Sequence, residues 1–154
     1  MLRGDKVILF LATAGPIGRI PVAPGTWGTL VALPIAYLVG RLPLALGVVV
    51  TGGLVAAAVR IASRAEASLG VEDPGAIVID EIAGLVVAFL GHPFVPASAV
   101  GIFLLFRLLD IVKPFPIGWA EKRLRGGTAV VMDDVLAGAG ANLIWRLARV
   151  SGWV

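Results

Sequence analysis

Five carboxylates stand against apolar stretches rather than in open loops, and they are the residues best suited to chemistry. Asp80 and Glu81 open one apolar stretch, Asp110 lies near the end of another, and Asp133 and Asp134 interrupt a third. Helix capping can explain Asp80, because negative charge is favourable at a helix N-terminus. It explains neither Asp110, at the opposite end of its stretch, nor two adjacent carboxylates among apolar residues. A shared divalent cation explains both, and an oxygen-only ligand set favours Mg²⁺ over zinc.

Other reactive groups are scarce. The chain has no cysteine and one histidine, His92, which excludes thiolate nucleophiles, Cys-ligated zinc and any mechanism that needs two histidines. A Cys-x5-Arg loop, a D-x-D-x-[TV] signature and the CDP-alcohol phosphatidyltransferase pattern are also absent. Polar chemistry is therefore left to carboxylates, lysine and arginine, and we interpret His92 as an interfacial turn residue.

Two basic residues share the stretch that holds Asp110. Arg107, Asp110 and Lys113 recur at i, i+3 and i+6, which predicts that each carboxylate–cation pair lies on neighbouring helix surface. A structural ladder of ion pairs fits this spacing. A row that binds phosphate beside a metal fits it equally well.

A turn at Pro24-Gly25-Thr26 precedes the first long apolar stretch. We expect Thr26 to be the N-cap of a helix, followed by free backbone N–H groups. Glycine allows an oxyanion to approach such a backbone, so Gly25 and Thr26 form a candidate phosphate cradle. Any Pro-Gly-Thr sequence that enters a membrane helix would look the same.

The elements that position these residues are apolar and helical. Hydrophobic residues make up 58% of the 154 and the mean hydropathy is +0.97, against about 45–50% apolar residues in soluble domains. Most stretches are shorter than the ~20 residues that cross a bilayer. We predict a single all-α domain, residues 1–154, folded as a compact membrane-embedded bundle of about five short helices. They are Trp27–Val39, Leu44–Ile61, Ile82–Leu90, Ala97–Val112 and Ala129–Ala148, while Val7–Ala14 is expected to be a short buried or interfacial segment.

A turn at His92–Pro96 decides where the charges lie. Prolines at positions 93 and 96 argue against one continuous helix, and a hairpin there makes successive helices alternate in direction. All ten acidic residues then fall on one side, and the basic residues opposite them are only Arg41, Arg146 and Arg149. The positive-inside tendency makes the charged side cytoplasmic. The excess of basic residues (pI near 10.0) suits anionic phospholipids or an anionic substrate. The sequence contains no basic stripe with interleaved aromatic residues, the pattern that would predict a nucleic-acid partner.

Four blocks in order, residues 24–30, 78–84, 106–117 and 126–138, resemble the phosphatidylglycerophosphatase A family. The resemblance implies a phosphatase of the bacterial inner membrane that hydrolyses phosphatidylglycerophosphate, a lipid phosphate, with Mg²⁺. It implies acidic functional positions at Asp80, Glu81, Asp110, Asp133 and Asp134, and a basic one at Lys113.

From these residues we expect metal-assisted hydrolysis. The five carboxylates would supply the metal ligands, and Asp80, Asp110, Lys113 and Asp134 would act in catalysis. Gly25, Thr26, Arg107 and Lys113 would bind the substrate. One alternative is a phosphatase that acts on a soluble phosphomonoester. Another is a non-enzymatic membrane protein, such as a small ion transporter, which predicts polar residues spread through the membrane depth.

Overall fold

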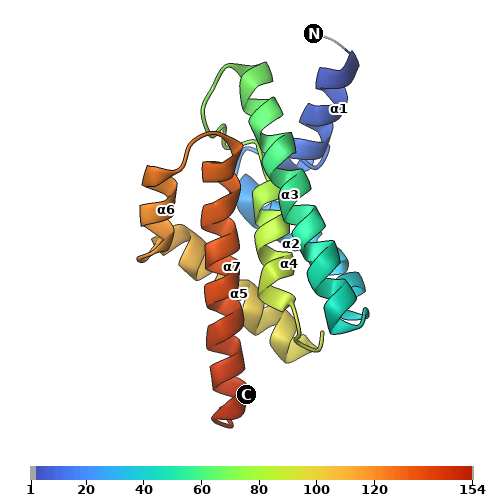
Figure 1. Cartoon of the computed structure of the whole chain (residues 1–154), viewed down its shortest axis with the longest axis vertical. Coiled ribbons are helices and arrows are strands. Elements are labelled where there is room, and N and C mark those ends of the chain that lie inside the picture. Colours follow the sequence, from blue (N-terminus) through green and yellow to red (C-terminus); the bar gives the residue numbers. More distant parts are fainter. Residues whose placement is uncertain (1–2, 154) are drawn as a thin grey trace.

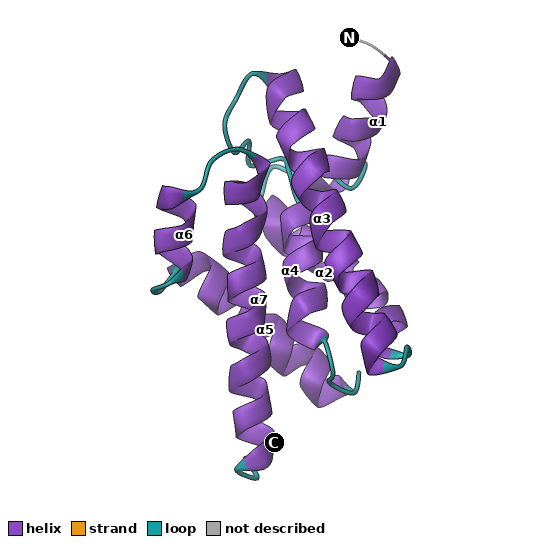
Figure 2. Ribbon diagram, viewed as in Figure 1, coloured by secondary structure: helices purple, strands orange, loops and turns teal. Residues whose placement is uncertain are grey.

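The computed structural model describes residues 3–153, and that part of the chain contains helices and no strand (Figure 2). Seven α-helices and one 3-10 helix follow one another: α1 (Arg3–Ala12), η1 (Ile17–Arg19), α2 (Pro24–Gly40), α3 (Leu44–Leu69), α4 (Ile79–Phe89), α5 (Pro96–Val112), α6 (Ile117–Arg123) and α7 (Gly127–Val150). The all-α prediction is confirmed. The count of about five is wrong, because α1 and α6 add to the five predicted helices.

Both additional helices are short, and the sequence around each of them did not predict a helix. The ten-residue α1 covers much of the segment expected to be merely buried or interfacial, and it packs on α3. The seven-residue α6 lies between Pro116 and the glycines at 126 and 127, inside what reads as a charged loop. Neither has the long apolar stretch that predicted the other five.

The predicted turn at His92–Pro96 is confirmed. Helix α4 ends at Phe89 and α5 begins at Pro96. The side-chain amide of Asn142, on α7, donates hydrogen bonds to the carbonyls of Val87, Ala88 and Leu90 at 3.3, 3.0 and 2.8 Å. These are among the carbonyls that a helix C-terminus leaves without partners, so α7 caps the end of α4.

Helices α4 and α7 run side by side in the same direction and form the most extensive helix pair (Figure 1). Two glycines allow this contact. A Cβ on Gly138 would overlap the carbonyl oxygen of Gly84, and a Cβ on Gly84 would lie 2.7 Å from the carbonyl oxygen of Asp134. Because residues four apart share a helix face, this crossing brings Asp80, one turn before Gly84, towards Asp134, one turn before Gly138.

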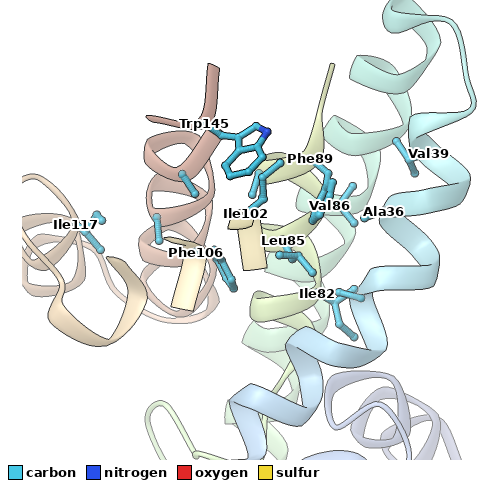
Figure 3. Close-up of a cluster of buried hydrophobic side chains, with 14 residues drawn as sticks. Ala36, Val39, Ile82, Leu85, Val86, Phe89, Ile102, Phe106, Ile117 and Trp145 are labelled. Carbon is cyan, nitrogen blue, oxygen red and sulfur yellow. The ribbon is translucent and has the colours of Figure 1, made fainter. Parts of the chain in front are cut away.

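The apolar core lies along the same pair. Phe89 of α4, Phe106 and Ile102 of α5 and Trp145 of α7 meet in one buried cluster (Figure 3). The ring of Trp145 covers Gly101, where a Cβ would clash with it. Alanines fill much of the remaining core, on α2, α3, α4 and α7. Small residues let helix backbones approach closely, as in membrane helix bundles.

The outer surface is also apolar. Helix α3 is long and apolar enough to cross a bilayer, the one such helix found among residues 3–153, and most of its apolar window is exposed. Large exposed apolar side chains also occur on the outward faces of α5 and α7, among them Val100, Leu104, Leu143 and Leu147. Contiguous exposed apolar surface of this kind marks an interaction or membrane surface rather than a water-facing one.

The contact between α4 and α7 predicts that Gly138→Ala destabilises the protein. The added methyl must push α7 away from the Gly84 carbonyl, and overpacking of this kind costs about 1–3 kcal/mol. Thermal unfolding of the detergent-solubilised protein would measure the change. Gly53→Ala is the matched control: no heavy atom lies near its Cβ position, so the alanine should stabilise α3 by about 0.5–1 kcal/mol. Equal effects of the two substitutions would contradict the proposed contact.

Candidate active site

Four helix segments converge around the carboxylates. They are the first turns of α2 and α4, the C-terminal end of α5 and the second turn of α7. A cavity of about 180 Å³ lies between three of them and the α3–α4 loop, and its lining is mostly polar. The lining residues are Asp73, Gly75, Ile77, Asp80, Glu81, Asp110, Lys113, Val130, Asp133 and Asp134. All five predicted carboxylates are therefore brought together.

Asp80, Glu81 and Asp134 form the first of two carboxylate sets. One oxygen from each lies within 4.8 Å of the others. The residues Asp80 and Asp134 are only 8% and 3% exposed. Asp80 Oδ1 and Glu81 Oε2 are buried and have no hydrogen-bond partner. Buried polar atoms are nearly always paired, so these two oxygens suit coordination of a cation.

Asp110, Asp133 and Asp134 form the second set, again with one oxygen from each within 4.8 Å of the others. Asp134 belongs to both sets and so lies at the centre of the cluster. Asp110 and Asp133 each form a close ion pair, 2.6 Å from Arg107 and 2.7 Å from Lys113, whereas Glu81 of the first set lies 3.9 Å from Arg107.

Arg107 connects α5 to α2 and α4. Its Nη1 lies 2.6 Å from Asp110 Oδ2 and 3.9 Å from Glu81 Oε1. The same nitrogen lies 3.4 Å from the hydroxyl of Thr29, to which it donates, and that hydroxyl donates to the carbonyl of Gly25 at 2.8 Å. The predicted pairing of Arg107 with Asp110 is confirmed, and the guanidinium also ties the start of α2 to the carboxylates.

The predicted pairing of Lys113 with Asp110 is wrong. Helix α5 ends at Val112, and Lys113 takes a left-handed conformation with φ of 48°. This turns its side chain away from the helix surface. Its Nζ donates to Asp133 Oδ2 and to Glu121 Oε1, each at 2.7 Å. Lys113 thus lines the cavity, as expected, but it joins α6 and α7 instead of extending a ladder along α5.

The predicted N-cap at Thr26 is also wrong. Helix α2 begins at Pro24 after Ala23, and the N–H groups of Thr26 and Trp27 both donate to the Ala23 carbonyl. Thr26 therefore sits inside the first turn. Gly25 lies against the cluster, since a Cβ there would overlap Glu81 Oε1. A substrate-binding role for Gly25 and Thr26 stays a prediction.

Burial and mutual repulsion shape the electrostatics. Burial raises the pKa of Asp80 well above its usual range, and the charge of Glu81 raises it further. Burial likewise raises the pKa of Asp134, with added repulsion from Asp80 and Asp110. Burial would lower the pKa of Lys113, but its hydrogen bonds to Asp133 and Glu121 outweigh burial and raise that pKa. Two cations thus face five carboxylates, a balance that favours an additional positive charge.

These residues fit a hard divalent cation. Carboxylate oxygens are the ligands of Mg²⁺, and the first set offers oxygens that nothing in the described chain satisfies. Acidic residues beyond the cluster do not match this pattern. Glu72, for example, is exposed and lies in a loop.

Three residues at the site were not predicted from the sequence. Thr29 is fully buried and holds the Gly25 carbonyl. Its position in the 24–30 block was the one available signal. Glu121 pairs with Lys113 through the fold of α6, and Asp73 lines the cavity from the α3–α4 loop. No spacing rule links either of them to the carboxylates.

The family model for phosphatidylglycerophosphatase A matches residues 10–149 of the chain. Phosphatidylglycerophosphatase A from Escherichia coli K12 is 35% identical over 129 residues, which cover 83% of this chain and 75% of that protein. The Haemophilus influenzae protein of the same name is 32% identical over 139 residues, 89% of this chain and 85% of its own. A Bacteroides thetaiotaomicron protein, provisionally named phosphatidylinositol-3-phosphatase, is 35% identical over 162 residues, which cover 100% of this chain and 99% of its own length. No solved structure matches.

The crowding of buried carboxylates predicts that Asp134→Asn stabilises the metal-free protein. The substitution removes one repelling charge, so the melting temperature in EDTA should rise by about 2–4 °C, the size of a ~1 kcal/mol change in a chain of this length. Mg²⁺ should raise the melting temperature of the wild type, since a ligand of the folded state stabilises it, and do so far less in the variant. Glu72→Gln, in an exposed loop, should leave both values unchanged. A lower melting temperature of Asp134→Asn in EDTA would contradict the repulsion.

Proposed function

This chain belongs to the phosphatidylglycerophosphatase A family, and from that membership and the carboxylate cavity we propose that it hydrolyses phosphatidylglycerophosphate. The products are phosphatidylglycerol and inorganic phosphate, a step of phospholipid biosynthesis. The observation that carries the proposal is the pair of unsatisfied oxygens, Asp80 Oδ1 and Glu81 Oε2, beside a cavity that is also lined by the basic residue Lys113. A metal and a phosphate satisfy both features at once.

Asp80, Glu81 and Asp134 are the proposed Mg²⁺ ligands, because one oxygen from each lies within 4.8 Å of the others and two of the residues have an oxygen without a hydrogen-bond partner. Mg²⁺ held there would polarise the phosphoryl oxygens and reduce the negative charge of the substrate. Asp133 completes the acidic wall and holds Lys113 in place. The metal-free cluster has an excess of carboxylates and would repel a phosphate, so substrate binding should require the cation.

The remaining groups would carry the phosphoryl transfer. Asp110 orients the attacking water and accepts its proton, while the water oxygen bonds to phosphorus and the bond to the glycerol oxygen breaks. The glycerol oxygen leaves as a hydroxyl by taking up a proton from solvent, and Asp110 releases the proton of the attacking water to solvent, so the cycle is balanced. Lys113 and Arg107 stabilise the charge that develops on the phosphoryl oxygens. Both lie close enough to the carboxylates to reach a phosphate bound among them.

We further propose that the domain, residues 1–154, is embedded in the bacterial inner membrane with this cavity facing the cytoplasm. Residues 1, 2 and 154 lie outside the described part of the chain. The exposed apolar surface of α3, α5 and α7 supports embedding, and the concentration of charge around the cavity supports the orientation. A membrane-resident site also matches a substrate whose acyl chains stay in the bilayer.

The rival functions have less support. A transporter predicts polar groups along the membrane depth, but Asn142 is occupied in capping α4, and Thr51 offers only a hydroxyl. The name of the Bacteroides relative points to a different lipid phosphomonoester as a candidate substrate. A cavity of about 500 Å³, which shares Asp73, Val130 and Asp133 with the carboxylate cavity, leaves space for a polyol headgroup.

The metal site predicts a large loss of activity when its ligands are neutralised. Asp80→Asn and Asp134→Asn should each lower kcat for phosphatidylglycerophosphate by at least about a hundredfold, a loss comparable to removing one preorganised electrostatic contact in an active site. EDTA should abolish activity, and Mg²⁺ should restore it. Phosphate release from mixed micelles measures both effects. Arg60→Gln, at an exposed position on α3, is the control, and activity that persists in EDTA or in either aspartate variant would rule out the metal-carboxylate mechanism.

Substrate choice can be tested with three phosphomonoesters at equal concentration. We expect kcat/KM to be highest for phosphatidylglycerophosphate, lower for phosphatidylinositol 3-phosphate and lowest for soluble glycerol 3-phosphate, which lacks the acyl chains that hold a substrate at the membrane. A preference for the inositol lipid would assign this chain the activity named for its Bacteroides relative. A preference for the soluble ester would overturn the lipid assignment.

A further inference from the structure

A second cavity lies between the α4–α5 turn and the C-terminal end of α7. Figure 1 shows these two segments at the opposite end of the molecule from the N-terminal ends of α4 and α7. The cavity has a volume of about 290 Å³, and it is lined by Gly91, His92, Arg146, Arg149 and Val150. The guanidinium of Arg146 lies over Gly91, where a Cβ would be 3.1 Å from its Nη2. None of these residues belongs to the proposed active site.

One ring nitrogen of His92, a residue that lines this cavity, is buried and has no hydrogen-bond partner. The residue is only 5% exposed. Its Nε2 lies 3.2 Å from the carbonyl oxygen of Asn142, and a carbonyl can only accept, so Nε2 carries a proton. The other ring nitrogen, Nδ1, is buried and has no hydrogen-bond partner. If the ring takes up a second proton, Nδ1 becomes a donor that requires an acceptor in the cavity.

The two arginines of this cavity carry positive charges that no acidic residue of the described chain balances. No ion pair forms at Arg146 or Arg149 within residues 3–153, and both side chains belong to exposed residues. The four ion pairs of the described chain all lie at the carboxylate end. Two guanidinium groups and a buried imidazole therefore converge where the protein supplies no anion, which is the donor set that recognises a phosphate group.

An apolar cavity adjoins this cationic one. It has a volume of about 230 Å³ and shares Arg149 with its neighbour. Its other lining residues are Pro93, Val95, Ala97, Ser98 and Trp145. A cationic cavity joined to an apolar one matches the two parts of a phospholipid, a charged headgroup and an acyl chain.

We propose that this end of the molecule binds one anionic phospholipid, with its headgroup phosphate against Arg146, Arg149 and His92. The upper part of an acyl chain lies along Val95 and Trp145. The phosphate accepts hydrogen bonds from the guanidinium groups, and its negative charge favours a second proton on the His92 ring, which Nδ1 then donates to it. The site is distinct from the active site, and it does not require the proposed function to be correct.

Binding can be measured by calorimetry on the detergent-solubilised full chain, titrated with dihexanoyl phosphatidylserine. This lipid is an anionic phosphodiester and neither the substrate nor the product proposed above. Arg146→Gln combined with Arg149→Gln should weaken its binding about 10- to 30-fold, as expected for two arginines near a lipid surface. The single variant Arg149→Gln carries the same test if the double variant melts at a lower temperature. Arg41→Gln is the matched control, since Arg41 lies at the same end but pairs with the hydroxyl of Tyr37.

A comparison of three compounds, the serine lipid, a zwitterionic lipid and inorganic phosphate, decides the nature of the ligand. Zwitterionic dihexanoyl phosphatidylcholine should bind at least about tenfold more weakly than the serine lipid, and inorganic phosphate should compete poorly because it lacks the acyl chain. Equal binding of phosphatidylcholine, or an equal loss of binding in Arg41→Gln, would overturn the anion site. Phosphate that binds as tightly as the lipid would overturn the acyl part of the proposal.

The position of the lipid can be checked by fluorescence. A variant with Trp27, Trp119 and Trp153 changed to Phe keeps Trp145 as its one indole. A dihexanoyl phosphatidylserine brominated on its acyl chain should quench this indole, and the arginine double variant should need correspondingly more lipid for the same quenching. Binding without quenching would place the lipid elsewhere and overturn the proposal.

Discussion

The contact of Gly84 with Gly138 fixes the distance between α4 and α7, and the carboxylate cavity depends on that distance. Each glycine lies one turn after a site aspartate, Asp80 on α4 and Asp134 on α7. A larger residue at either position would move the helices apart and separate the two carboxylates. The burial that results also raises the pKa of both aspartates. Close packing and a site prepared for a cation therefore have the same cause.

The two basic residues at the site hold the other helices to this pair. Arg107 joins α5 to the first turns of α2 and α4, and Lys113 joins α6 to α7. The pairs of Arg107, and the pair of Lys113 with Asp133, are partly buried, where removal of one partner is costly. Arg107 and Lys113 thus have two roles. They are positioned to bind a phosphate, and they hold the carboxylates in place. A variant of Lys113 or Arg107 should for this reason be checked for folding before a loss of activity is assigned to catalysis.

The sequence predicted where the long helices lie because each contains an apolar stretch bounded by proline, glycine or charge. The predicted end of α3 at Ile61 was wrong, because the helix continues through charged residues to Leu69. The turn at His92–Pro96 was readable from two prolines, and it correctly placed Asp80 and Asp110 at one end. Features that depend on a single backbone conformation were not readable. The left-handed turn at Lys113 redirects its amine to Asp133, and the start of α2 at Pro24 moves Thr26 into the helix. Glu121 reaches the site only through the short helix α6, which has no apolar stretch of its own.

The bonds from Asn142 to the last carbonyls of α4 have a consequence for motion. They join α7 to α4 at the end farthest from the carboxylates, while the glycine contact joins the two helices near the site. A pair fixed at two points along its length cannot slide or rotate as separate rods, so α4 and α7 form one rigid body. Any opening that admits a headgroup is then left to the other segments around the cavity, the α3–α4 loop, the end of α5 and α6.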